Sequence, residues 1–163
     1  MTKSPIEQRS PAALRDRIRA AFPDTVQSGS VTPADEETDE DLDETRALYV
    51  ALRGRKWSDI PASFIKEYAY SIPLLTEESF VMFLPAWLTG ALDDQETRRA
   101  MVYTFSPDRR DEDTSFMDRR VQRLSGAQKE AIRAFLSHSV DVEPSKFVKE
   151  RARRALEYVS GFG

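Results

Sequence analysis

Apolar residues recur at three- and four-residue steps along most of the chain, which is the spacing of one face of an α-helix. In the first such stretch, residues 11–22, Leu14, Ile18 and Phe22 form one apolar stripe. Ser10 followed by Pro11 predicts an N-cap with proline in the first turn. We expect Pro23 to end this helix and the polar residues 24–31 to form a flexible connector.

A second helix is expected to open at Thr32-Pro33 and to run through an acidic stretch to Gly54. Trp57 lies in the connector that follows, and Pro61 opens another short helix. A clearer start signal comes at Thr76, an N-cap residue followed by two acidic residues.

Leu75 and Phe80 stand at the positions of a hydrophobic staple across that helix start. Pro85 lies inside the continuing apolar run and predicts a kink or a break between two short helices, the second of which should end near Gly90.

Helical patterns continue to the end of the chain, over residues 94–105, behind a capping box at Ser125 and Gln128, and over residues 144–160. Residues 106–115 are polar and without periodicity, so a loop is expected there. In the last helix the expected inward residues are Val148, Ala152, Ala155 and Val159. The pattern predicts an all-α fold, an irregular single-domain bundle of six to eight helices. Residues 1–31 would form an N-terminal helix with its connector, and residues 32–163 the helical domain.

Composition narrows the chemistry more than it identifies a function. The 163 residues suit one domain, and 32% of them are charged. Zero cysteines exclude disulfides, thiol catalysis and cysteine-based metal sites, and His138 is the one histidine. We therefore assign no metal and no cofactor, and a dipole-complementing role suits His138 better than catalysis. No signal peptide is visible, and the apolar run of residues 80–92 is shorter than the roughly 20 residues of a membrane span, so the cytoplasm is expected.

Charge is concentrated in one segment. Residues 35–44 hold eight acidic and no basic side chains, so the rest of a chain of net charge −4 carries a formal +4. Asp39, Asp41 and Asp43 alternate as in a calcium loop, but Glu44 and Val50 stand where such a loop needs glycine and glutamate. Two interpretations remain: a solvated, helix-starting stretch, or a patch that steers a partner with a basic surface.

Arginine pairs and aromatic residues offer further candidate sites. Four arginine pairs suggest nucleic-acid binding as a candidate function, at residues 98–99, 109–110, 119–120 and 153–154. Acidic residues lie among these pairs, however, and no known nucleic-acid recognition motif accompanies them. Trp57, Tyr68 and Tyr70 open an aromatic-rich stretch that continues through Phe80, Phe83 and Trp87. These aromatic side chains could form core, or a groove that faces a ligand or partner.

Four ordered segments carry a resemblance to a known family: W-S-D-I at 57–60, L-L-T-E-E-S-F at 74–80, F-L-P-A-W-L at 83–88 and L-S-G-A-Q-K-E-A-I-R-A-F-L at 124–136. The chain resembles a family of small, uncharacterised bacterial proteins over about residues 46–136, with a weaker match at 155–158. Such proteins often end the last helix with Tyr-Trp, where this chain has Tyr158-Val159. The resemblance implies a bacterial source and a soluble domain, and it transfers no catalytic residue, cofactor or substrate.

The hypothesis that follows is a bacterial cytoplasmic protein-binding or regulatory module, possessing the size and acidity of an immunity protein. No catalytic residue is assigned, no membrane is involved, and the oligomeric state is left open. The alternative is an enzyme or small-ligand binder with a pocket near Trp57 and the aromatic residues of 68–87, and nucleic-acid binding comes third. The candidate partner-binding residues are Asp39, Asp41, Asp43, Trp57, Tyr68 and Tyr70.

Overall fold

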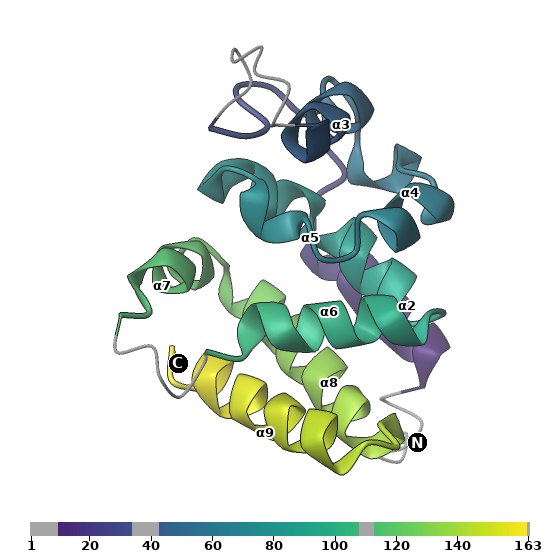
Figure 1. Ribbon diagram of the computed structural model, residues 1–163, viewed down its shortest axis with the longest axis vertical. Helices are drawn as coiled ribbons and strands as arrows, with labels where there is room; N and C mark the ends of the chain where they lie inside the picture. The colour runs from purple at the N-terminus through teal and green to yellow at the C-terminus, as the bar shows by residue number, and fades with distance from the viewer. Residues whose placement is uncertain (1–9, 34–42, 108–112, 163) are drawn as a thin grey trace.

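A computed structural model describes residues 10–33, 43–107 and 113–162 (Figure 1). Within these ranges the chain forms eight α-helices, two short 3-10 helices and no strand, which confirms the all-α prediction. The α-helices are α2 (Pro11–Ala21), α3 (Asp43–Leu52), α4 (Ala62–Glu67), α5 (Glu77–Ala91), α6 (Gln95–Phe105), α7 (Ser115–Gln122), α8 (Gly126–Val142) and α9 (Lys146–Ser160). The 3-10 helices are η2 (Trp57–Asp59) and η3 (Ile72–Leu74).

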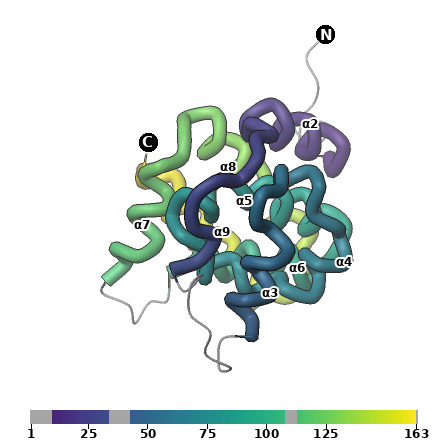
Figure 2. The backbone as a smooth tube through the Cα atoms, turned by 90° about the horizontal axis from the view of Figure 1, so that it is seen from above, coloured from purple at the N-terminus to yellow at the C-terminus, as the bar shows by residue number. Residues whose placement is uncertain are grey.

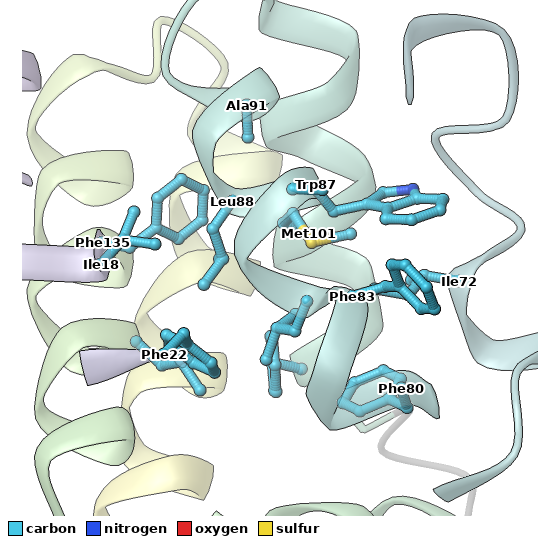
Figure 3. Close-up of a cluster of buried hydrophobic side chains, with 14 of the residues drawn as sticks. Ile18, Phe22, Ile72, Phe80, Phe83, Trp87, Leu88, Ala91, Met101 and Phe135 are labelled. Atoms are coloured by element: carbon cyan, nitrogen blue, oxygen red, sulfur yellow. The ribbon is translucent and has the colours of Figure 1, made fainter. Parts of the chain in front are cut away.

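Helix α5 is the centre of the bundle, because α2, α4, α6, α7 and both 3-10 helices pack against it (Figure 2). Its side chains are apolar nearly all the way round, as in a helix surrounded by protein. Leu88 points toward Ile18 and Phe135, while Phe83 lies beside Ile72 on the other side (Figure 3). The molecule therefore has one core, built outward from both sides of α5.

Helix starts follow the sequence signals closely. Ser10 caps α2 by accepting a hydrogen bond from the Ala13 amide, and Thr76 caps α5 through the Ser79 amide. Ser125 and Gln128 form the predicted capping box at the start of α8. The staple residues before and within α5 are both fully buried. In α9 the buried side chains are the predicted inward set, Val148, Ala152, Ala155 and Val159.

The predicted break at Pro85 does not occur, since α5 continues through this residue to Ala91. A proline inside a helix costs about 3 kcal/mol, because it lacks an N–H and crowds the preceding turn. Pro85 is buried, as are Phe83, Leu84 and Trp87 around it. Packing on both sides of α5 outweighs this local cost, so tertiary contacts decide where the helix ends.

Apolar spacing in the sequence does not predict helix α7. It begins at Ser115, the last residue of the predicted loop, and it is held by Arg120, which is 4% exposed. Arg120 donates to the backbone oxygens of Leu75 and Phe116 at 2.8 and 2.9 Å, and its guanidinium carbon lies 3.7 Å from the Phe116 ring centroid. A buried arginine thus holds a helix that lacks a regular apolar stripe.

The segment between α2 and α3 is fastened to the bundle where the structure describes it. The Gln27 amide donates to the oxygen of Arg55 at 2.9 Å, and the Gln27 side chain accepts from the Gly54 amide at 3.0 Å. Gly54 has a positive φ of 69° just after α3, as expected of a residue that follows a helix end. The start of the second helix, expected at Thr32-Pro33, leads into residues 34–42, which lie outside the described ranges.

Gly90 is the last residue but one of α5, so the helix ends close to the predicted position. A Cβ atom placed on Gly90 would lie 2.8 Å from Cγ2 of Ile65, a buried residue of α4. Gly126, the first residue of α8, has no atom within 4 Å of the same ideal Cβ position. The two glycines therefore differ in the space around them, and Gly90 permits the close approach of α4 to α5.

Gly90→Ala is expected to lower the free energy of unfolding by about 1–2 kcal/mol, because Ile65 is branched at Cβ and has no room to shift. Gly126→Ala is expected to leave stability unchanged or to raise it by up to about 1 kcal/mol, as helix propensity alone dictates. Urea unfolding of both variants measures the difference. A Gly90→Ala protein as stable as the Gly126→Ala protein would contradict the close packing.

Candidate functional site

The structure separates the three aromatic residues singled out from the sequence. Trp57 is 6% exposed and belongs to the core, where η2 packs against α5. Tyr68 is partly buried against Phe64, with ring centroids 4.7 Å apart. Tyr70 is 54% exposed and lies on the surface between α4 and η3. Of the three side chains, Tyr70 is the one presented to solvent.

Of the three acidic candidates, the structure describes Asp43, an exposed residue in the first turn of α3. Asp39 and Asp41 lie outside the described residues. The neighbouring Glu44 accepts a hydrogen bond from the Ser71 hydroxyl. This bond ties the first turn of α3 to the segment that carries Tyr70, so Asp43 and Tyr70 belong to the same region of the surface.

Tyr70 is held in place by contacts with α6. Its hydroxyl donates to Oε2 of Glu96 at 3.3 Å, and its ring is stacked on Tyr103 with centroids 6.5 Å apart. Partial burial, followed by the nearby Glu96 carboxylate, raises the pKa of Tyr70 above its usual value of 10.0, so the hydroxyl remains a donor at neutral pH. We call the surface formed by Asp43, Glu44, Tyr70, Glu96 and Tyr103 the Tyr70 edge.

The arginine pairs are used largely within the protein. Among the described pairs, Arg98 and Arg99 both bind Glu143, Arg119 binds Glu77, and Arg153 binds Glu150. Arg120 is buried, as described above, and residues 109–110 lie outside the described ranges. These arrangements favour a structural role for the paired arginines over a phosphate-binding footprint.

The most buried of these carboxylates is Glu143, whose side chain is 1% exposed. It accepts from Nε and Nη2 of Arg99 at 3.0 and 2.9 Å, from Nη2 of Arg98 at 3.2 Å and from the Ser145 amide at 3.0 Å. Hydrogen bonding by Arg99, with those from Ser145 and Arg98, lowers the pKa of Glu143 from 4.5 to about 2 despite burial. Each of its two oxygens accepts two hydrogen bonds. Because the donors come from α6 and from the turn before α9, this carboxylate holds these two segments together.

A cavity of about 310 Å³ lies where the end of α6 and the start of α7 meet α9. Tyr103, Thr104, Asp113, Phe116 and Arg151 are among its lining residues. Another cavity, of about 260 Å³, lies between α2, α5 and α8 and has Phe22, Val81 and Met82 in its wall. Neither cavity is lined by Trp57 or by the aromatic residues of 68–87, where the sequence places its alternative pocket.

A family model matches residues 11–159, and its description is a family of unknown function, DUF6714. The chain belongs to this family. The match covers the segments that carry the sequence resemblance and extends through α9, which confirms the assignment to a family of unknown function.

No curated protein and no solved structure matches this DUF6714 domain. The described residues contain no group of three or more side chains suited to hold a metal ion. Within the same residues no helix is both long enough and apolar enough to cross a membrane.

Sequence reasoning missed the residues that line the cavity beside α6. Tyr103 has the spacing of an ordinary helix residue, Phe116 follows a polar run, and Arg151 stands in an arginine-rich helix. Arg151 meets Ser106 across a separation of 45 residues, a contact that no local pattern reveals. One signal was present, since Phe116 is an isolated aromatic residue in a polar stretch.

The Glu143 cluster predicts a specific pH dependence of stability for this DUF6714 domain. A carboxylate whose pKa is lower in the folded protein stabilises it above the unfolded pKa and loses that effect as the pH falls toward the folded pKa. The shift from 4.5 to about 2 corresponds to roughly 3 kcal/mol at neutral pH. We expect Glu143→Gln to lose about this much at pH 7 and to approach the wild type as the pH falls from about 4.5 toward 2.

Urea unfolding between pH 7 and pH 2.5 measures this difference. Glu130→Gln is the control, because Glu130 is 62% exposed and pairs with Arg133 on the same helix. Its unfolding free energy should stay within about 0.5 kcal/mol of the wild type at each pH. A constant gap between Glu143→Gln and the wild type across this range would refute the role assigned to the ionised carboxylate.

Proposed function

We propose that this domain is a protein-binding module that presents the Tyr70 edge to a partner with a basic surface. The observation that carries the proposal is Tyr70 itself, a 54% exposed ring fixed by Tyr103 and Glu96. An exposed aromatic side chain that is already ordered loses little conformational freedom when a partner covers it. Tyrosine is also among the residue types enriched at the energetic centres of protein interfaces.

Charge around Tyr70 supports the choice of partner. Asp43 and Glu44 are exposed in the first turn of α3, and Glu96 is 64% exposed beside the tyrosine hydroxyl. The sequence adds six further acidic residues at positions 35–41, immediately before this turn. A concentrated negative charge next to an aromatic contact residue accelerates the association of a positively charged partner.

Two further parts of the sequence hypothesis belong to this proposal. A cytoplasmic, regulatory protein of the immunity type would use such an edge to bind and restrain a basic target. Tyr68 and the core residue Trp57 would then support this surface by packing beneath it and would not contact the partner. Tyr68 packs on Phe64, and Trp57 packs against α5.

The first test is affinity capture from the native host with the wild type, with Tyr70→Ala and with Val26→Ala as the matched control. Val26 is a 56% exposed residue of the connector after α2, and it takes part in none of the contacts that define the Tyr70 edge. We expect a partner that co-purifies with the wild type and with Val26→Ala, and whose affinity for Tyr70→Ala is at least tenfold weaker, about 1.4 kcal/mol or more. Equal capture by all three proteins would remove Tyr70 from the interface.

The electrostatic part is tested by replacing Asp39, Asp41 and Asp43 with asparagine. The association rate with the captured partner should fall several-fold at low salt, and its dependence on ionic strength should weaken, while the dissociation rate changes little. Stopped-flow or surface-based kinetics at several salt concentrations measure both quantities. Unchanged association kinetics would refute electrostatic steering by the acidic segment. The contact made by Tyr70 is tested separately by Tyr70→Ala.

A further inference from the structure

The cavity beside α6 has the size and the lining of a small-molecule site. Its volume of about 310 Å³ is at the lower end of the range for ligand pockets. The elements that line it are the end of α6, the start of α7 and α9, which come together on the left side of the bundle in Figure 1. Among the described residues its walls combine aromatic rings with one guanidinium group, that of Arg151, which is the main determinant of what the cavity can bind.

Arg151 is held in a fixed orientation at the wall of this cavity. Its Nε donates to the Ser106 hydroxyl at 2.9 Å and its Nη2 donates to the Ser106 carbonyl at 3.1 Å. The guanidinium carbon lies 4.8 Å from the centroid of the Tyr103 ring. These contacts fix the plane of the group before any ligand arrives, and they leave the N–H groups of Nη1 without a partner among the described residues.

Arg151 also differs from the arginines that join the helices. Arg99 and Arg119 each bind a carboxylate of this chain, whereas Arg151 binds only neutral oxygens within the described ranges. The helix-joining Arg120 also binds only neutral oxygens, but Arg120 is buried and does not line the cavity. A guanidinium forms its strongest hydrogen bonds with planar oxyanions. A guanidinium held in this way, with no carboxylate partner among the described residues, is therefore suited to bind an anionic group.

The apolar part of the cavity suits a flat body. Phe116 is 47% exposed, and Arg120 covers one face of its ring at 3.7 Å, so its other face and edge supply the exposed area. Pro107 and Met117 extend the apolar wall. A flat ring can stack on the free face of Phe116 while its charged group meets Arg151.

Asp113 limits the charge that the cavity accepts. It lines the same cavity, and hydrogen bonds from Ser115 lower the pKa of its carboxyl group, so Asp113 is ionised at neutral pH. A ligand with two negative charges would meet more repulsion from Asp113 than a ligand with one. The same doubled charge is also attracted twice as strongly by Arg151, so the choice of a single carboxylate rests on desolvation, which costs a dianion more than a monoanion.

We propose that the cavity between α6, α7 and α9 binds a small aromatic carboxylate, with Arg151 holding the carboxylate and Phe116 stacking on the ring. Benzoate is the simplest probe of this chemistry. A fragment of this size is expected to bind with about millimolar affinity. Its binding should shift the amide signals of Tyr103, Ser106 and Phe116 in a saturable nuclear magnetic resonance titration of the full chain.

The probes and variants are chosen so that each tests one contact. Benzamide, which has the same shape without the charge, and phenyl phosphate, which carries up to two charges, should both bind at least threefold more weakly than benzoate. Arg151→Gln should weaken benzoate at least tenfold, and Asp113→Asn should strengthen it about threefold. Arg153→Gln is the control, because Arg153 lies on the same helix and pairs with Glu150; it should leave the affinity within twofold of the wild type.

Arg151→Gln also removes the bonds to Ser106, so its fold is checked by the same spectra. Should that variant fail to fold, Arg151→Lys serves in its place, since it keeps the charge but not the planar fork, and it should weaken benzoate several-fold. The proposal is overturned by benzoate shifts that do not saturate, by equal binding to the Arg151 variant and the wild type, or by benzamide binding as tightly as benzoate. Tighter binding of phenyl phosphate would overturn the choice of a carboxylate.

Discussion

The ion cluster at Glu143 sets the geometry on which both candidate surfaces depend. It joins Arg98 and Arg99 of α6 to the turn between α8 and α9, and Ser145, which caps α9, donates to the same carboxylate. Since Arg151 meets Ser106 further along, α6 and α9 run side by side in the same direction (Figure 1). This arrangement brings Arg151 to the Tyr103 ring, and Tyr103 supports Tyr70. The buried carboxylate of Glu143 thus holds in register the residues on which both proposals depend.

The charged residues of this protein divide into two sets with different roles. One set joins helices, as in the pairs of Glu77 with Arg119 and Arg123, and has its charge satisfied inside the molecule. The other set, with Asp43 and Arg151 as examples, has no carboxylate or guanidinium partner among the described residues. A formal net charge of −4 conceals this division, because charges of the first set cancel locally.

Local signals in the sequence predict most of the fold and little of the site. Caps at Ser10, Thr76 and Ser125 were found because each depends on residues three positions apart. The continuity of α5 through Pro85 was not predicted, because it depends on packing from several other helices. Helix α7 was not predicted either, because it has no regular apolar spacing. Tyr70 could be singled out as a candidate but not as an exposed residue, since its exposure depends on α6. The cavity was invisible for the same reason, as its lining comes from segments distant in the chain.

Helix α2, near the start of the chain, packs against α5 and α8. During synthesis on the ribosome, α2 therefore emerges long before α8, one of its two main partners. Helix α5 is apolar nearly all round, and part of its surface stays exposed until α7 has been synthesised and packs against it. A nascent chain of this protein therefore exposes a strongly apolar segment at least until residue 122, the end of α7, has been made, and transiently exposed apolar surface of this kind is prone to aggregation.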